Sequence, residues 1–316
     1  MHRLVIAACL TVLLLAAGIT ASAQSSNTVY DFLRNDVGAR AAAMAGSFVT
    51  VTDDPNALFY NPASLGTLQS AKGSVGFFKH LLDINAGYIS YGQSFEDIGE
   101  FAAGAIYTNY GSFTETDAVG NTIGSFTASD LAIDLGYANT LDQNLYYGVG
   151  VKVIYSSIAG YTSSGLAGDF GLLYVMPDNK MTIGASIRNA GRQLSTYLGT
   201  REDLPLDFTV GGSIVPKGLP LLLNVGFHKL NESADKFWDR FAPFTVGGEF
   251  TASKAVFLRF GYDNEARKDL RVGTTTGLEG FSGGIGIIVS DYRFDYSLSA
   301  LGVIGNLHRI SVSSNF

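Results

Sequence analysis

One short stretch of the chain has the residue spacing of a hydrolase nucleophile. Gly280 to Gly284 read Gly-Phe-Ser-Gly-Gly, which matches the pattern G-x-S-x-G. In enzymes this pattern places a serine on a sharp turn between a strand and a helix, where a histidine can activate it. The histidines available for that role are His80, His228 and His308. The residues after Gly284 instead read as a strand, a tight turn and another strand, so we interpret the glycines as small residues of a curved strand and expect no enzyme.

Metal and cofactor chemistry have little support in the sequence. The histidines and carboxylates do not cluster at the spacing of metal ligands, so neither a metal site nor a cofactor is expected. Cys9 is the only cysteine and lies in the first 23 residues, so the remaining chain has no disulfide and no thiolate ligand. The net charge of −7 argues against nucleic acid as a partner.

A second group of chemically capable residues consists of charges of both signs on stretches that otherwise alternate. If these side chains face an enclosed interior, they predict ion pairs and hydrogen bonds between a plug and a surrounding wall. A single-sign ring for ion selectivity would look different. The alternative is that some of them face bulk water near the rims. The candidates are Arg40, Asp130, Asp134, Lys152, Asp207, Glu249, Arg293 and Asp295, with Arg34, Asp53 and Asp54 in the N-terminal part.

Alternation of apolar and polar residues recurs from about residue 70 to the C-terminus. In residues 206–214 and 292–299, an apolar set that includes Gly212 occupies every second position, with Thr, Ser, Asp, Arg or Gly between its members. Such patterns indicate strands with one apolar and one polar face. Charged residues make up only 16% of the chain, and no stretch after Ile19 is long enough for a membrane helix.

The lengths of the connections distinguish a membrane barrel from a soluble sandwich, which also alternates. About fourteen candidate strands follow residue 70. Short connections containing LDQN, PDN, PKG, ASK and SD lie between longer ones at 111–125, 157–165, 189–204, 231–240 and 264–276. Outer-membrane barrels have short periplasmic turns and longer external loops. We therefore predict an all-β fold, a closed antiparallel transmembrane β-barrel of about 14 strands over residues 71–316.

Residues 1–23 have the layout of a secretory signal peptide. A basic start at His2 and Arg3 precedes an apolar run from Leu4 to Ile19, and Ala-Ser-Ala stands before Gln24. A transmembrane anchor is the alternative, but the run is only about 16 residues long. We predict removal of residues 1–23 and a final location in the bacterial cell outer membrane.

The stretch DDPNALFYNPASLG contains two Asx-Pro pairs seven residues apart. Asp54 and Asn61 are good helix N-caps, and Pro55 and Pro62 then occupy the first helical position, where a missing N–H costs nothing. The pairs predict two short capped helical turns, the second ended by Gly66. An ordinary cluster of surface turns is the alternative.

Together with these turns, the N-terminal block and the C-terminus resemble a known family. GARAAAMAGSFVTVTDDPNALFYNPASLG and the closing LHRISVSSNF are similar to the PorV/PorQ outer-membrane proteins, relatives of the FadL-type fatty-acid transporters. Asn61-Pro62-Ala63 matches the NPA motif of the N-terminal hatch in both groups. The resemblance implies a fourteen-stranded barrel with residues 24–70 folded as a hatch, or plug, inside the lumen. It assigns the hatch motif to Asp53, Asp54, Pro55, Asn56, Asn61, Pro62 and Ala63, and a barrel-insertion signal to Phe316.

The resemblance implies a role as an accessory to type IX protein secretion, in the receipt or attachment of cargo at the outer membrane. The alternative is FadL-like passive transport of small hydrophobic molecules. Short polar external loops such as TETDAVGNT favour the PorV/PorQ side over fatty-acid capture. The expected partners are outer-membrane lipid, the barrel-insertion machinery, secreted cargo with a C-terminal sorting domain, and other secretion components.

Overall fold

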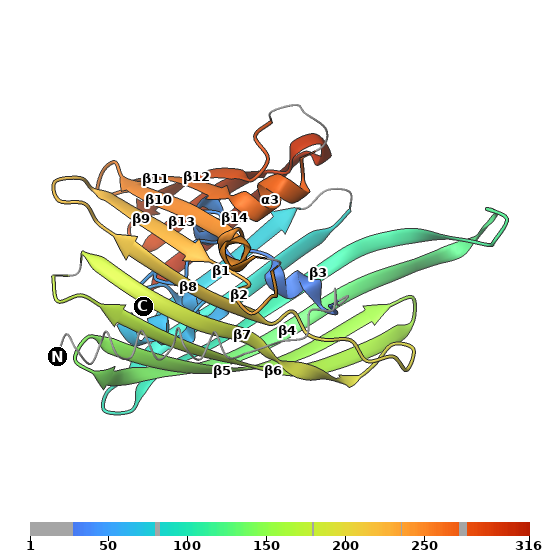
Figure 1. Ribbon diagram of the computed structural model, residues 1–316, viewed down its shortest axis with the longest axis horizontal. Helices are drawn as coiled ribbons and strands as arrows, with labels where there is room; N and C mark the ends of the chain where they lie inside the picture. The colour runs from blue at the N-terminus through green and yellow to red at the C-terminus, as the bar shows by residue number, and fades with distance from the viewer. Residues whose placement is uncertain (1–27, 80–82, 179, 235, 272–276) are drawn as a thin grey trace.

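The computed structural model describes residues 28–79, 83–178, 180–234, 236–271 and 277–316; the predicted signal peptide and His80 lie outside these ranges. The described residues form a closed barrel of fourteen antiparallel strands, each paired with its neighbours in sequence (Figure 1). β1 (Lys72–Lys79) pairs with β14 (Asn306–Asn315) and closes the barrel. The predicted fold class is confirmed.

The wall of the barrel is taller on one side than on the other. The strands between β1 and β14 are β2 (Asn85–Phe95), β3 (Gly99–Thr116), β4 (Thr122–Asp142), β5 (Leu145–Ile158), β6 (Tyr161–Val175), β7 (Met181–Ser195), β8 (Asp207–Ile214), β9 (Leu221–Phe227), β10 (Phe244–Thr251), β11 (Val256–Asp263), β12 (Phe281–Val289) and β13 (Tyr292–Ala300). Strands β3 to β7 have 14 to 21 residues. Strands β8 to β11 have only 7 or 8.

Every strand has one face toward the lumen and one toward the outside. On β5, Val151 and Val153 are 54% and 51% exposed, whereas Lys152 and Ile154 between and beside them are buried. The same alternation places apolar side chains around the outside of the whole barrel. A closed sheet with an apolar exterior satisfies all its backbone groups internally and suits a lipid environment. The barrel is therefore built to span a membrane.

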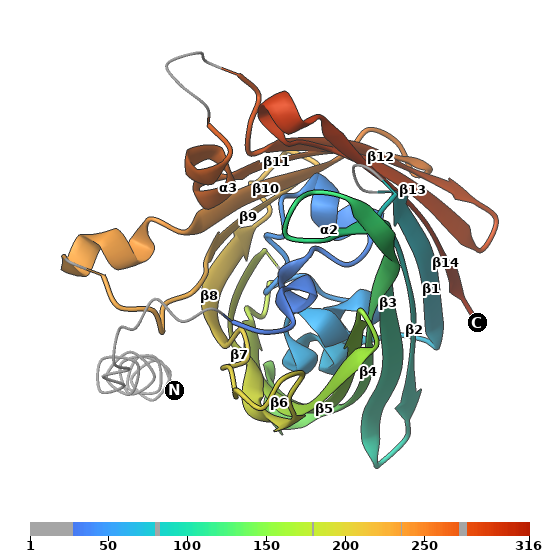
Figure 2. The ribbon, with the colours of Figure 1, turned by 90° about the vertical axis from the view of Figure 1, so that its right-hand side faces the viewer.

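Residues 28–71 precede the first strand, and most of this segment fills the lumen (Figure 2). This hatch contains η1 (Asp31–Arg34), α2 (Ala39–Ala43), η2 (Pro55–Phe59) and η3 (Pro62–Thr67). Its apolar side chains, among them Met44, Phe48, Leu58 and Leu65, are fully buried against inward-facing residues of the wall. α2 packs against β11 to β14, which its small alanine side chains permit.

The predicted end of the second turn was wrong, because η3 continues through Gly66 to Thr67. The Thr67 hydroxyl donates a hydrogen bond to the carbonyl oxygen of Ser64 at 2.6 Å and so stabilises the last turn. Gly66 serves a different purpose there. A Cβ atom at this position would lie 2.7 Å from the ring of Tyr146, so the glycine allows close packing against β5.

The predicted long connections are shorter than expected at three places. β3 and β4 pair well into 111–125, leaving only residues 117–121 between them, and this hairpin extends beyond the rest of the barrel (Figure 1). Two residues join β5 to β6, and β7 continues to Ser195. Pairing continues because strands outside the lipid do not need an apolar face. The longer connections between β9 and β10, between β11 and β12, and between β13 and β14 carry η4 (Phe237–Phe241), α3 (Asn264–Asp269) and η5 (Gly302–Ile304).

No helix among the described residues is long and apolar enough to cross a membrane.

Candidate functional site

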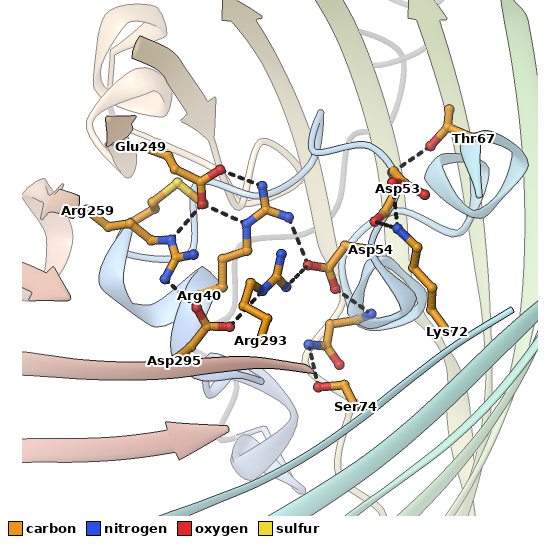
Figure 3. Close-up of polar contacts among 12 residues, drawn as sticks. Arg40, Asp53, Asp54, Thr67, Lys72, Ser74, Glu249, Arg259, Arg293 and Asp295 are labelled. Carbon is orange, nitrogen blue, oxygen red and sulfur yellow. Dashed lines mark hydrogen bonds and ion pairs between the residues drawn. The ribbon is translucent and has the colours of Figure 1, made fainter. Parts of the chain in front are cut away.

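Six charged side chains form a closed ring between the hatch and the barrel wall (Figure 3). Positive and negative groups alternate around it, and each group contacts the next. The hatch supplies two members and strands β10, β11 and β13 supply the other four. In order, the members are Arg40, Glu249, Arg259, Asp295, Arg293 and Asp54.

The contact between Arg40 and Glu249 is bidentate. Arg40 Nε and Nη2 donate to the two carboxylate oxygens of Glu249 at 2.8 and 2.7 Å. Such a pair is stronger and more specific in geometry than a single hydrogen bond. Arg40 Nη1 also donates to Asp54 Oδ2 at 2.9 Å. The arginine of α2 therefore joins the wall to a second part of the hatch.

The other half of the ring runs through two arginines of the wall. Arg259 donates to Glu249 at 2.6 Å and to Asp295 at 2.7 Å. Arg293 donates to Asp295 at 3.0 Å and to Asp54 Oδ2 at 3.1 Å, which closes the ring. With three members of each sign, the ring has no net charge. Burying an unpaired charge costs several kcal/mol of stability, so removal of one member would leave the charges of its neighbours buried with one partner fewer.

Asp54 is fully enclosed and accepts hydrogen bonds on both oxygens. Burial alone would raise the pKa of its carboxyl group, but Arg293 and Arg40 outweigh burial and hold the pKa below its usual value. Burial alone would lower the pKa of Arg40, but the carboxylates of Glu249 and Asp54 outweigh burial and raise the pKa above its ordinary value. Both hatch members are thus charged at neutral pH. The ring fixes the position of the hatch by electrostatics as well as by packing.

The local sequence shapes the hatch so that Asp54 can reach the ring. Asp54 is the N-cap of η2: its Oδ1 accepts a hydrogen bond from the Asn56 backbone N–H at 3.0 Å, and Pro55 is the first helical residue. Cap and ring therefore use different oxygens of one carboxylate. Neighbouring Asp53 has a φ of 57° and forms an ion pair of 2.5 Å with Lys72 of β1.

Asn61, Pro62 and Ala63 lie in a seat formed by glycines of the wall. Asn61 is fully buried and caps η3 through the Ala63 backbone N–H at 3.1 Å. Its Nδ2 donates to the carbonyl oxygens of Val49 at 2.8 Å and of Leu172, on β6, at 3.2 Å. The seat consists of Gly148 on β5, Gly171 on β6 and Gly184 on β7, because a Cβ atom on any of them would overlap the hatch.

Asn56 links the hatch to the first two strands. Its Nδ2 donates to the Ser74 hydroxyl and to the Tyr88 hydroxyl, both at 3.3 Å. Its Oδ1 accepts a hydrogen bond from the Ser90 hydroxyl at 2.7 Å. These hatch residues therefore contact the wall in three directions: Asp53 and Asn56 at β1 and β2, Asn61 to Ala63 at β5 to β7, and Asp54 at β13.

The remaining lumenal candidates belong to separate clusters. Asp134 pairs with Lys152 at 3.3 Å, and Lys152 also pairs with Asp169 at 3.3 Å. Asp207 pairs with Arg188, whose Nη1 also donates to the carbonyl oxygen of Phe59 in the hatch at 3.0 Å. A further candidate, Asp130, accepts hydrogen bonds from the hydroxyls of Tyr110 and Ser156 and, among the described residues, has no ion pair.

Four charged residues of these clusters were not identified from the sequence: Lys72, Asp169, Arg188 and Arg259. Arg259 stands in the apolar stretch VFLRFGYD, where alternation places it on the face opposite Leu258 and Phe260. That position is the only sequence signal for its lumenal location. Its two carboxylate partners are 10 and 36 residues away along the chain, so their proximity depends on the barrel.

The G-x-S-x-G stretch does not have the geometry of a nucleophile. Ser282 lies within β12 and its hydroxyl bonds the hydroxyl of Ser299 on β13 at 3.2 Å. His228 follows β9 directly and contacts the hydroxyls of Thr209 and Thr245, while His308 contacts the Tyr296 hydroxyl at the barrel surface. Within the part of the chain that the structure describes, no group of three or more His, Cys, Asp or Glu side chains could hold a metal ion.

Two adjacent pockets lie beside the hatch, at the end of the barrel that carries the longer connections. The smaller, of about 150 Å³, is lined mostly by polar and charged residues, among them Arg188, Asp207 and His228. The larger, of about 360 Å³, is the mouth pocket. Its lining includes the charged residues Arg34, Asp36 and Arg309 and the apolar residues Leu270, Phe281, Leu301, Ile304 and Leu307. The hatch therefore forms part of the wall of both pockets.

Phe316 lies at the opposite end of the barrel. Its backbone N–H donates to the carbonyl oxygen of Ala71 at 2.8 Å, and its ring lies 6.2 Å from that of Tyr91. The side chain is 74% exposed. The last residue thus extends the closing seam and presents an aromatic ring on the surface, and its role in insertion stays a prediction.

No protein-family model matches the chain, and no curated protein matches its sequence. Solved structures do resemble it. The toluene transporter TodX of Pseudomonas putida has a TM-score of 0.63 at 14% identity, with 89% of this chain and 98% of TodX covered. The toluene transporter TbuX of Ralstonia pickettii gives 0.61 at 15%, with 88% and 98% covered. A FadL homologue of Pseudomonas aeruginosa gives 0.57 at 10%, with 89% and 98% covered. At these identities the likeness shows the fold.

Proposed function

We propose that this protein is a passive channel for small hydrophobic molecules in the bacterial outer membrane. The mouth pocket is the observation that carries the proposal. Its volume of about 360 Å³ is within the range of small-molecule sites, and its lining combines apolar with polar residues. A hydrophobic molecule could leave the surrounding medium on Ile304 and Leu301 and move toward the hatch.

The fold likeness to TodX and TbuX, which are toluene transporters, supports this proposal as an analogy. It favours the transport interpretation of the sequence over the interpretation as an accessory of type IX secretion. The resemblance to PorV/PorQ through Asn61-Pro62-Ala63 is compatible with both, because both groups carry the motif. We further propose removal of residues 1–23, recognition of Phe316 by the insertion machinery, and outer-membrane lipid as the surrounding partner.

Uptake by whole cells tests the function. De-energised cells of a Gram-negative host that express the protein should take up radiolabelled toluene faster than cells with an empty vector. Ile304→Asp should reduce this gain several-fold, because it places a charge among the apolar residues that line the mouth pocket. Leu198→Asp is the matched control: Leu198 is also exposed, at 76%, but does not line the pocket.

Uptake equal to that of the empty vector, with the barrel shown to be folded, would contradict transport. A pull-down from the secreted proteins of the source organism tests the interpretation as an accessory of secretion. Recovery of several proteins that share a C-terminal domain, lost when that domain is deleted, would support the secretion role instead.

A further inference from the structure

An aromatic cluster lies on the outside of the barrel in the connection between β9 and β10. Phe237, Trp238 and Phe241 all belong to η4, and their ring centroids are 5.3 to 6.3 Å apart. Phe237 is 63% exposed and Trp238 is 77% exposed. The segment lies beside β8 and β9, away from the lumen (Figure 2). Three large rings in contact with each other, two of them largely exposed, indicate an interaction surface.

The cluster is continuous with the lipid-facing surface of the wall. Phe241 contacts Phe227, the last residue of β9, with their rings edge to face at 5.6 Å. Phe227 is on the same outward face of β9 as Val225, which is 38% exposed. The exterior apolar band therefore passes from the strand onto η4 without a polar interruption.

The wall is short where the cluster begins. A tilted strand needs about 9 to 11 residues to cross the hydrocarbon core. β8 to β11 have 7 or 8 residues each, whereas β3 to β7 on the other side have at least 14. Above β9, lipid would otherwise meet the end of the sheet, and η4 supplies apolar side chains at this level.

We infer that η4 is a lipid anchor, with Phe237, Trp238 and Phe241 inserted among the lipids next to β8 and β9. Aromatic side chains are favoured at the boundary between hydrocarbon and headgroups. Lys236, which is exposed, precedes the rings, and Arg240 lies between Trp238 and Phe241 next to the exposed Asp239; the two cations can contact the phosphate groups of lipids. The occupant is lipid because the surface that the cluster extends is itself the lipid-facing surface. This inference is independent of what passes through the lumen.

The chain offers a direct probe, because Trp238 is its only tryptophan. The full-length mature protein would be reconstituted in dioleoylphosphatidylcholine vesicles, with or without lipid brominated on the acyl chain near the headgroup. We expect Trp238 emission to be blue-shifted relative to the urea-unfolded protein. Brominated lipid should remove most of the emission, whereas iodide in the buffer should remove little.

A paired variant checks that the cluster holds the tryptophan in place. Phe237→Ser combined with Phe241→Ser should shift the emission to the red and weaken quenching by brominated lipid, while the barrel keeps its heat-dependent shift on gels. Leu219→Ser, at an exposed position in the short turn between β8 and β9, should leave the emission unchanged. Emission of the unaltered protein that is red-shifted, insensitive to brominated lipid and strongly quenched by iodide would overturn the inference. A surface for a protein partner would then be the better account.

Discussion

Arg259 and Arg309 both face the lumen and are each 5% exposed, yet only Arg259 has carboxylate partners among the described residues. Arg259 contacts Glu249 and Asp295. The side chain of Arg309 has one hydrogen bond to the described part of the chain, from Nη1 to the Ser299 hydroxyl at 3.1 Å, and lies over the Phe78 ring at 5.4 Å. The two arginines are equally buried, but only removal of Arg259 would take a partner from buried carboxylates.

We expect Arg259→Met to lower the free energy of unfolding by about 3 to 5 kcal/mol, because two buried carboxylates lose a partner. Arg309→Met should change it by less than about 1 kcal/mol, since no buried anion is left unpaired. Urea titration of the protein in detergent, followed by the heat-dependent gel shift, measures both. Equal losses for the two variants would refute the importance of the charge ring.

The contact between Arg40 and Glu249 should show strong coupling in a double-mutant cycle. Arg40→Met and Glu249→Met should each destabilise by about 3 kcal/mol, while the double variant should lose clearly less than the sum. Arg201→Met is the control, because Arg201 is exposed and has no ion pair among the described residues; it should stay within about 0.5 kcal/mol of the unaltered protein. Additive losses would mean that the pair does not act as a unit.

The glycine seat predicts an effect of a single methyl group. Gly148→Ala and Gly171→Ala should displace Pro62 and Asn61, with a loss of about 1 to 3 kcal/mol and faster proteolysis of residues 28–70. Gly168→Ala, on the same strand as Gly171, has its nearest neighbour at 3.6 Å and should be tolerated. Proteolysis at the same rate in all three variants would show that the seat can adapt.

The charge of Asp54 predicts a dependence on pH. Its pKa in the folded protein is below the ordinary value of 3.8, so its contribution to stability is fully present above that pH and is lost as the pH falls through the folded pKa. Asp54→Asn can keep the cap but cannot pair with Arg40 and Arg293. The difference in stability between the two proteins should be constant near neutral pH and should narrow below pH 3.8. A difference that stays the same in acid would exclude the charge as its source.

The architecture was predictable because it depends on local patterns. Period-two alternation locates strands, and Asx-Pro pairs locate caps, since each acts over a few residues. Pairing in the lumen was not predictable in detail, because Arg259 meets Asp295 only after the sheet curves. The prediction of a loop at 111–125 was wrong because it, too, depended on local alternation. Beyond the lipid, Phe113 and Phe126 still stack at 5.2 Å and the strands still pair, but the sequence there no longer alternates in polarity.

The charge ring joins residues that are far apart along the chain. Arg40 and Asp54 are synthesised before any strand, whereas their partners, at positions 249 and 293, are among the last to be made. The glycine seat, by contrast, holds Asn61 against β5 to β7, in the middle of the chain. The charges of Arg40 and Asp54 meet their wall partners only where β10 and β13 stand beside the hatch. The ring therefore ties the N-terminal hatch to strands near the other end of the chain, and its assembly requires those strands to be in place.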